Sequence, residues 1–428
     1  MAENKLALSR FQATVRALRH RNFRLFFLGQ LVSLIGTWMQ TVAQSWLVYR
    51  LTGSSALLGS VNFASQIPVF LLSPAGGVVA DRYNRHRLVI ATQAASMLLA
   101  LVLAGLTLFH MVKVWQIFVL SALLGIVNAF DIPARQAFIV EMTSREDLIN
   151  AIALNSSAFN GARIVGPAVA GILVAAVGEG WCFFANGVSY IAVIAGLLAM
   201  KLQPYRPRHV ESSVLRHIGE GFRFIADTAP IRALLLLVGL VSLAGMPYSV
   251  LMPIFADRIL NAGAQGLGIL MGISGLGALA GALLLASRQT VRGLGRWIVI
   301  SSASFSALLI VFAYSRWFWL SAAVLVPIGF SVMIQMGSTN TLIQSMTPDA
   351  MRGRVLAGYS MMLMGMAPIG ALIAGVLAEH IGARATVSAG ALACGAAAAA
   401  FALHLPGIRQ EARELILAQS ATIPPEAS

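Results

Sequence analysis

The chain has 428 residues, of which 58% are hydrophobic and only 11% are charged, and its mean hydropathy is +0.80. A soluble globular protein carries about 25% charged residues, so this composition excludes a soluble fold. The formal net charge is +14, but the basic residues are spread along the chain and form no single cluster, so no nucleic-acid partner is expected.

Apolar stretches of roughly 20 residues, each long enough to cross a bilayer, recur along the chain. Hydropathy predicts twelve membrane helices, at residues 25–49, 55–80, 88–110, 114–134, 148–177, 181–200, 231–254, 263–286, 297–314, 317–341, 354–378 and 385–404. The N-terminal arm and alternate loops hold 24 Lys and Arg residues, and the opposite loops hold five. The positive-inside rule therefore predicts that both termini lie in the cytoplasm.

These helices predict an all-α membrane protein with two bundles of six helices each. The expected segments are a cytoplasmic arm at 1–24, a first bundle at 25–200, a linker at 201–230, a second bundle at 231–404 and a cytoplasmic tail at 405–428. The apolar segment that follows the arm is too long for a signal-peptide core, so we expect it to be retained. Residues 214–225 are amphipathic and are expected to lie on the membrane surface.

Polar residues on the first two predicted helices recur at spacings of three and four, which places them on one face of each helix. Such faces are expected to line a water-filled transport path, and hydrogen bonding between packed helices is the alternative. The residues are Gln30, Ser33, Thr37, Gln40 and Gln44 on the first helix, and Asn62 and Gln66 on the second.

The loop after the second helix combines a glycine, an aspartate and a basic cluster: Gly77, Asp81, Arg82, Arg85 and Arg87. A carboxylate here can accept hydrogen bonds from the N-terminal end of a neighbouring helix, and arginines can pair with acids. The pattern resembles the signature loop of the major facilitator superfamily, which implies a latch that breaks when the two halves rock. The alternative is that the arginines only set the topology.

Further motifs resemble the branch of this superfamily that includes the enterobactin exporter and related secretion permeases. They lie at residues 24–30, 36–44, 51–55, 133–137, 162–167 and 352–355, and the similarity spans most of residues 20–400. The resemblance implies the major facilitator fold, with two pseudo-symmetric six-helix bundles, and efflux powered by the proton gradient.

The fourth and fifth helices carry charges inside or near the membrane. Asp131 and Arg135 form an i, i+4 pair near the cytoplasmic end of the fourth helix, which favours a solvated pair, and they are also the candidate coupling pair. Arg163 lies far inside the fifth helix, where charge is rare and functional. It is predicted to bind an anionic substrate, to pair with Asp131, or to hold backbone carbonyls at a helix bend. Asn160 lies on the same face.

The fifth helix also carries Gly161, Gly166, Pro167 and Gly171. Small residues allow close helix packing, and proline removes a backbone hydrogen bond and bends a helix. This group resembles the glycine-proline motif of drug and proton antiporters, and ordinary helix packing is the alternative.

The second half of the chain repeats the first. At an offset of 204, residues 139–178 align with 343–382 without a gap and with eleven identities. Parallel repeats of this kind place a substrate site near the midplane where the halves meet. In the second half, Gln335 and Tyr359 are candidate path residues among a cluster of methionines, which predicts a large, partly apolar substrate.

The leading hypothesis is a proton-coupled exporter of an amphipathic small molecule, such as a siderophore-like metabolite or a drug, acting by alternating access in the bacterial inner membrane. An importer or a lipid flippase of the same fold, and a membrane scaffold that does not transport, are the alternatives. No motif for an enzyme, cofactor or metal is found, and Cys182 and Cys394 are expected in the core. A monomer in the lipid bilayer is expected, with protons and a small-molecule substrate as partners.

Overall fold

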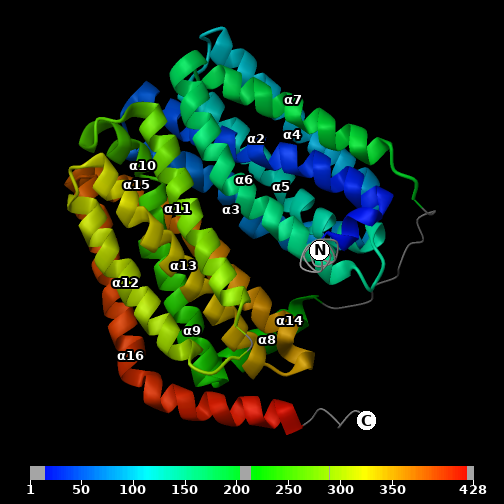
Figure 1. The fold of residues 1–428 in the computed structure, drawn as a ribbon, viewed down its shortest axis with the longest axis vertical. Helices are drawn as coiled ribbons and strands as arrows, with labels where there is room; N and C mark the ends of the chain where they lie inside the picture. The colour runs from blue at the N-terminus through cyan, green and yellow to red at the C-terminus, as the bar shows by residue number, and fades with distance from the viewer. Residues whose placement is uncertain (1–14, 203–213, 289, 422–428) are drawn as a thin grey trace, which may run out of the picture. The chain divides into compact units, whose positions relative to one another are not determined.

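A computed structural model describes residues 15–202, 214–288 and 290–421, and these residues form helices and no strands (Figure 1). In the described part of the chain twelve helical spans are long and apolar enough to cross a membrane. This confirms the predicted fold class. Ten of the spans are single helices, and the other two are composed of several helical pieces.

The first half contains α2 (Arg21–Thr52), α3 (Ser55–Arg82), α4 (Arg85–Leu108), α5 (Val114–Met142), α6 (Leu148–Val177) and α7 (Glu179–Leu198). The second half contains α9 (Ala229–Leu240), α10 (Met252–Ile254), α11 (Gly263–Ala286), α12 (Leu294–Tyr314), α13 (Phe318–Met346), α14 (Asp349–Ser360), α15 (Met366–Ile381) and α16 (Ala383–Ala421). A short 3-10 turn, Arg16–Arg19, precedes α2, and α8 (Val214–Asp227) precedes α9.

The chain divides into two compact units. Each unit consists mainly of one half of the sequence and includes a short segment of the other half. The first unit contains the described parts of Met1–Gly53 and Ala64–Val210, together with Gly263–Gly272. The second contains Ser54–Phe63 and the remaining described residues. The first turns of α3 therefore belong to the second unit, and the first turns of α11 belong to the first unit.

In the first unit, α2 packs against α6 and α7, and α4 packs against α5 and α7. Phe23, Phe26 and Phe138 are fully buried in its core. Small residues bring the backbones close: a Cβ atom at Gly29 of α2 would lie 2.8 Å from the carbonyl oxygen of Ala192 on α7. A larger residue at this position would force the two helices apart.

In the second unit, α12 packs against α13 and α16, and two spans contain π-helical turns. One turn, Val241–Gly245, follows α9, and another, Met361–Gly365, joins α14 to α15. Pro368 lacks an N–H and so leaves the carbonyl of Met364 without its usual donor, which explains the wider turn before it. The Ser242 hydroxyl donates to the carbonyl of Leu363 at 2.5 Å and links the two turns.

The repeat extends to the backbone at the ends of α6 and α15. Gly178 and Gly382, which the offset of 204 aligns, follow these helices with φ of 89° and 84°. Their N–H groups donate to the carbonyls of Val174 and Ala378, which the same offset aligns. Positive φ favours glycine, so the repeat preserves the way each helix ends.

The predicted amphipathic segment of the linker forms a helix, and the last helix extends beyond its predicted end. The amphipathic segment forms α8, which packs on α14, where Arg354 pairs with Glu220 at 2.7 Å. The last helix does not end near residue 404 but continues through Pro406 to Ala421, and Figure 1 shows α16 turning in its last part. Proline bends a helix without always ending it, and the residues beyond it are strong helix formers.

Candidate functional site

The signature loop lies between α3 and α4 and is organised by Arg85. Its guanidinium contacts Asp81 at 3.0 Å, Glu141 of α5 at 3.0 Å, and the carbonyl of Ala80 at 3.0 Å. The side chain of Asn84 caps α4 by accepting from the N–H of Arg87. The predicted pairing of an arginine with acids is therefore present within the first unit. Gly77 lies in α3, and Arg82 and Arg87 are exposed.

Asp131 is a buried carboxylate with a complete set of partners. Its side chain is 5% exposed, and one of its oxygens accepts from both the Thr92 hydroxyl at 2.8 Å and the Gln93 amide at 2.9 Å. Arg135 contacts the other oxygen at 3.2 Å. The expected solvated pair is instead a buried one, because α4 packs over this face of α5 and supplies two donors.

The polar face of α2 is used largely for packing within the first unit. The Asn186 amide on α7 donates to Gln40 at 2.6 Å, and the Gln44 amide donates to Ser121 on α5 at 2.9 Å. Gln30 and Ser33 are buried, and the Thr37 hydroxyl, which is partly exposed, donates to the carbonyl of Ser33. Gln40 and Gln44 therefore bond to neighbouring helices of the first unit. On α3, Asn62 is partly buried and Gln66 is exposed.

On α6, Arg163 lies beside two aromatic rings. Its guanidinium carbon is 5.8 Å from the centroid of the Trp38 ring, and Trp38 meets Phe159 edge to face at 5.6 Å. Among the described residues no acid forms an ion pair with Arg163, and Asp131 is engaged with other partners. The two residues therefore do not form the pair that the sequence allowed. Asn160 is exposed, and its amide donates to the carbonyl of Ser156.

The glycine-proline group lies on α6, which is one continuous helix through Pro167. A Cβ atom at Gly166 would lie 2.5 Å from that of Trp38 on α2, and one at Gly171 would lie 3.0 Å from the Cα of Gly268 on α11. Gly161 has open space around it. Gly166 and Gly171 thus allow close helix packing. The open space around Gly161 shows that the sequence spacing of the glycines does not by itself determine which of them pack closely.

Polar residues in the second unit are buried on α13. Gln335 is 1% exposed, and Ser338 and Thr339 are fully buried. The Tyr359 hydroxyl donates to the carbonyl of Met336 at 3.0 Å. Met361 and Met364, in the π-helical turn, are exposed. Gln335 and Tyr359 are therefore enclosed within this unit, and the two methionines are the accessible part of the predicted cluster.

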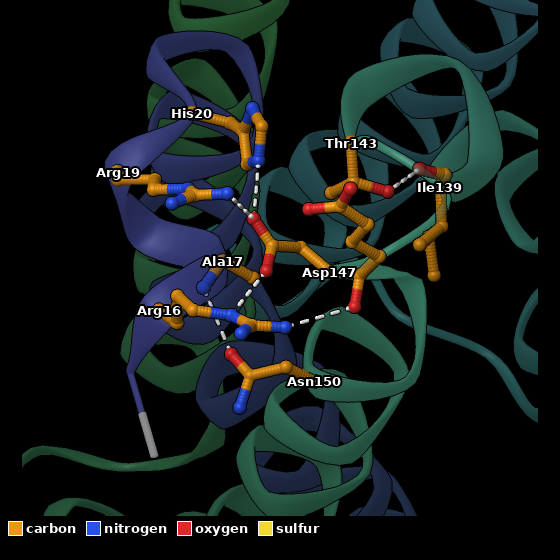
Figure 2. A network of polar contacts seen from close by, with 9 residues as sticks. Arg16, Ala17, Arg19, His20, Ile139, Thr143, Asp147 and Asn150 are labelled. Carbon is orange, nitrogen blue, oxygen red and sulfur yellow. Dashed lines mark hydrogen bonds and ion pairs between the residues drawn. The ribbon is translucent and has the colours of Figure 1, made fainter. Parts of the chain in front are cut away.

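Figure 2 shows a polar network around Asp147 that the sequence did not predict. The Asp147 carboxylate, fully buried, contacts Arg16, Arg19 at 2.8 Å and His20 at 2.7 Å, and the backbone N–H of Ala17 donates to Asn150. The hydrogen bond from His20 holds the pKa of Asp147 below its ordinary range, and the two arginines add to this effect. The sequence holds a signal for this network: Asp147 lies directly before α6, where an acid is favourable, and the N-terminal segment is basic.

A second missed network caps α3 within the second unit. One carboxylate oxygen of Glu379, near the end of α15, accepts from the backbone N–H groups of Ser55 at 2.9 Å and Ala56 at 3.2 Å. The hydroxyls of Ser54 and Ser55 donate to the same oxygen. Close below, Gly59 and Gly375 bring the two backbones together.

No group of three or more His, Cys, Asp or Glu side chains suited to a metal ion occurs in the part of the chain that the structure describes. Cys182 and Cys394 are both free and buried. The chemistry that the site offers is therefore that of charged and hydrogen-bonding side chains: a buried carboxylate at Asp131 and an arginine beside aromatic rings.

The twelve membrane-capable helices and the matching helix ends of the two halves define a multi-pass membrane protein with an internal repeat. Solved structures share the fold. A mutant of the nucleoside transporter NupG has a TM-score of 0.71 with 14% identity, covering 90% of this chain and 99% of that one. A mutant of the peptide transporter POT in complex with alafosfalin has a TM-score of 0.72 with 12% identity, covering 91% and 95%.

The family model described as transmembrane secretion effector matches residues 12–425, so the chain belongs to this family. The staphyloferrin A transporter of Staphylococcus aureus (strain NCTC 8325 / PS 47) is 25% identical over 83% of this chain and 89% of that protein. The enterobactin exporter EntS of Shigella boydii serotype 4 (strain Sb227) is 25% identical over 86% and 88%. These relatives are transporters and not enzymes. The family match and the relatives confirm the family resemblance and show that the chain is a transporter of the major facilitator type.

Proposed function

We propose that this protein exports an amphipathic small molecule across the bacterial inner membrane, with protons as the coupling ion and both termini in the cytoplasm. Its similarity to an enterobactin exporter and a staphyloferrin A transporter supports small-molecule export, and the excess of basic residues on the N-terminal arm and alternate loops supports the orientation. It acts as a monomer. The relatives also supply two test substrates, enterobactin and staphyloferrin A.

The observation that carries proton coupling is the buried carboxylate of Asp131. A charged group inside the bundle is stable only while Arg135, Thr92 and Gln93 compensate it. Adding a proton removes the charge, weakens the contact with Arg135, and frees that arginine to change partners. Proton binding and a local rearrangement of α4 and α5 are thus linked, as coupling requires.

The test is the Asp131→Asn variant in proteoliposomes. The amide keeps the size of the side chain but carries no titratable proton. We expect accumulation of enterobactin or staphyloferrin A under an imposed pH gradient to fall about tenfold or more, while exchange of labelled for unlabelled substrate continues, because exchange requires no net proton movement.

Asp349→Asn is the matched control, because the Asp349 side chain is 88% exposed and forms only a surface pair with Arg352. It should transport as the unaltered protein does. Gradient-driven accumulation by Asp131→Asn at the normal level would show that another group carries the proton. Loss of both accumulation and exchange, with normal folding, would assign Asp131 to substrate movement and not to coupling.

A further inference from the structure

We infer that Arg163, Trp38 and Phe159 form a binding subsite for a ligand that carries an anionic group on an aromatic ring, an aromatic acid. The inference rests on the proposed function, since it gives the chemical class of the exported molecule. It concerns a single place in the first unit, where α2 and α6 meet.

The packing of α2 on α6 fixes the geometry of this subsite. Gly166 has no side chain, so the Cβ of Trp38 and the backbone atoms of Ile35 and Met39 lie directly against it, and a Cβ atom at this position would lie 2.5 Å from that of Trp38. This places the Trp38 ring beside Arg163, which lies one turn before Gly166 on α6. The ring also contacts Phe159, which lies one turn before Arg163. Leu34, Ala158 and Ala162 fill the seam beside the rings with apolar surface. The guanidinium and the two rings are therefore held by the helices and not by a loop.

The charge of Arg163 is only partly compensated. The Trp38 ring, at 5.8 Å, faces the cation but accepts no conventional hydrogen bond, so the ring does not occupy the five N–H donors of the guanidinium. No acid pairs with Arg163 among the described residues, and the Asp131 carboxylate is held by partners on α4 and α5. Asn160, the polar residue nearest in sequence on the same face, directs its amide to the helix backbone. A cation inside a membrane span with free donors is suited to an anion.

The surrounding groups define the rest of the ligand. The planar fork of arginine matches a carboxylate or a similar two-oxygen anion, while its face stays on Trp38. Phe159 is 46% exposed, and its edge-to-face contact leaves ring surface that a second aromatic ring can cover. An anion without an aromatic ring would contact only Arg163, and a neutral aromatic molecule would contact only the rings of Trp38 and Phe159. An aromatic acid uses both.

The experiment measures equilibrium binding to the purified full chain in nanodiscs of phosphatidylcholine, without any gradient. The probes are 2-naphthoate, its neutral counterpart 2-naphthamide, and cyclohexanecarboxylate, which keeps the anion and lacks the aromatic ring. We expect 2-naphthoate to bind about tenfold more tightly than either of the others, since each lacks one of the two interactions.

Variants then assign the effect to residues. Arg163→Gln should weaken 2-naphthoate binding about tenfold, and Arg163→Lys should weaken it less, because lysine keeps the charge without the fork. Trp38→Leu should also weaken it. Arg145→Gln, an exposed arginine in the α5–α6 connection, is the matched control and should bind normally. Thermal unfolding of each variant checks that it folds. If Arg163→Gln does not fold, binding by Arg163→Lys still decides the test.

A lipid phosphate could supply an anion to the same guanidinium, so the measurement is repeated with nanodiscs containing phosphatidylglycerol. We expect 2-naphthoate binding to stay within about twofold, because a lipid headgroup has no aromatic ring for Phe159. Strong competition by phosphatidylglycerol would overturn the inference in favour of a lipid site. Equal binding of naphthoate and naphthamide, or normal binding by both Arg163 variants, would overturn it too.

These outcomes are separate from those that test the proposed function. Binding that depends on Arg163, without gradient-driven export, would leave the subsite in place and reject export. Export driven by the gradient, with binding indifferent to Arg163, would reject the subsite alone.

Discussion

Asp147 carries its charge out of solvent because three basic side chains of the N-terminal segment surround it (Figure 2). Arg16, Arg19 and His20 come from one short stretch before α2, and Asp147 comes from the α5–α6 connection. The carboxylate therefore fastens the beginning of α2 to another part of the first unit. The sequence did not predict this, since the basic arm was interpreted only as a topology signal.

The pKa of Asp147 lies below its ordinary range in the folded protein, mainly through the hydrogen bond from His20. A lowered pKa means that the folded state favours the charged form. The resulting stability is fully present above the ordinary aspartate value, about pH 4, and is lost as pH falls through the lower folded value.

Asp147→Asn should therefore lower the thermal unfolding temperature at neutral pH, and by more than the surface control Asp349→Asn. The difference in unfolding temperature between the variant and the unaltered protein should stay constant from pH 7 to about pH 5. It should shrink below about pH 4, where Asp147 of the unaltered protein becomes protonated and its stabilising contribution is lost. Thermal melts of both variants across this range measure it. A deficit that grows on acidification would contradict the assigned role.

Single residues also show the limit of prediction from periodicity. The spacing of Gln40 and Gln44 predicts that they lie on one face of α2, but periodicity cannot say what that face meets. Their partners, Asn186 and Ser121, lie on helices far along the chain. The burial of Asp131 likewise depends on how α4 is rotated against α5, which no local pattern of sequence reveals.

Helices were predicted well where apolar length decides and less well where the backbone is irregular. The π-helical turn at Met361–Gly365 lies inside a continuous apolar run. Pro368 is its sequence signal, yet a proline can also lie within a continuous α-helix, as Pro167 does in α6. The end of α16 was predicted at residue 404 from hydropathy, which does not detect the part of the helix that continues beyond it.

The cap of α3 by Glu379 gives a prediction for a helix terminus. Glu379→Gln should weaken the cap, because a neutral amide oxygen accepts these four hydrogen bonds less strongly than a carboxylate. Loss of a cap costs about 1 kcal/mol, so local opening of the first turn of α3 should increase roughly fivefold. Hydrogen exchange of the amides at residues 55–58 measures this.

Glu414→Gln, at an exposed position of α16, is the matched control for this change and should leave exchange at α3 unaltered. If Glu379→Gln also leaves it unaltered, the carboxylate does not stabilise the start of α3. Exchange that rises throughout both units would indicate general unfolding and would also contradict a local cap.

At the scale of the molecule, composition and hydropathy predicted twelve spans, and the internal repeat predicted two related halves. The helix ends at Gly178 and Gly382 show how closely the halves correspond. The sequence did not predict that Ser54–Phe63 and Gly263–Gly272 each belong to the compact unit of the other half. Such an exchange depends on contacts made by small residues, among them Gly59 with Gly375 and Gly171 with Gly268, which leave no hydropathy signal.

The measurement that tests proton-coupled export most directly is substrate uptake into inside-out membrane vesicles with an imposed pH gradient. With an acidic lumen, vesicles that contain the protein should accumulate enterobactin or staphyloferrin A above the level in vesicles that lack it. A protonophore should abolish this accumulation, ATP should not be required, and Asp131→Asn should fail to accumulate. Accumulation that persists after complete collapse of the gradient, or that occurs only when the gradient is reversed, would contradict proton-driven export.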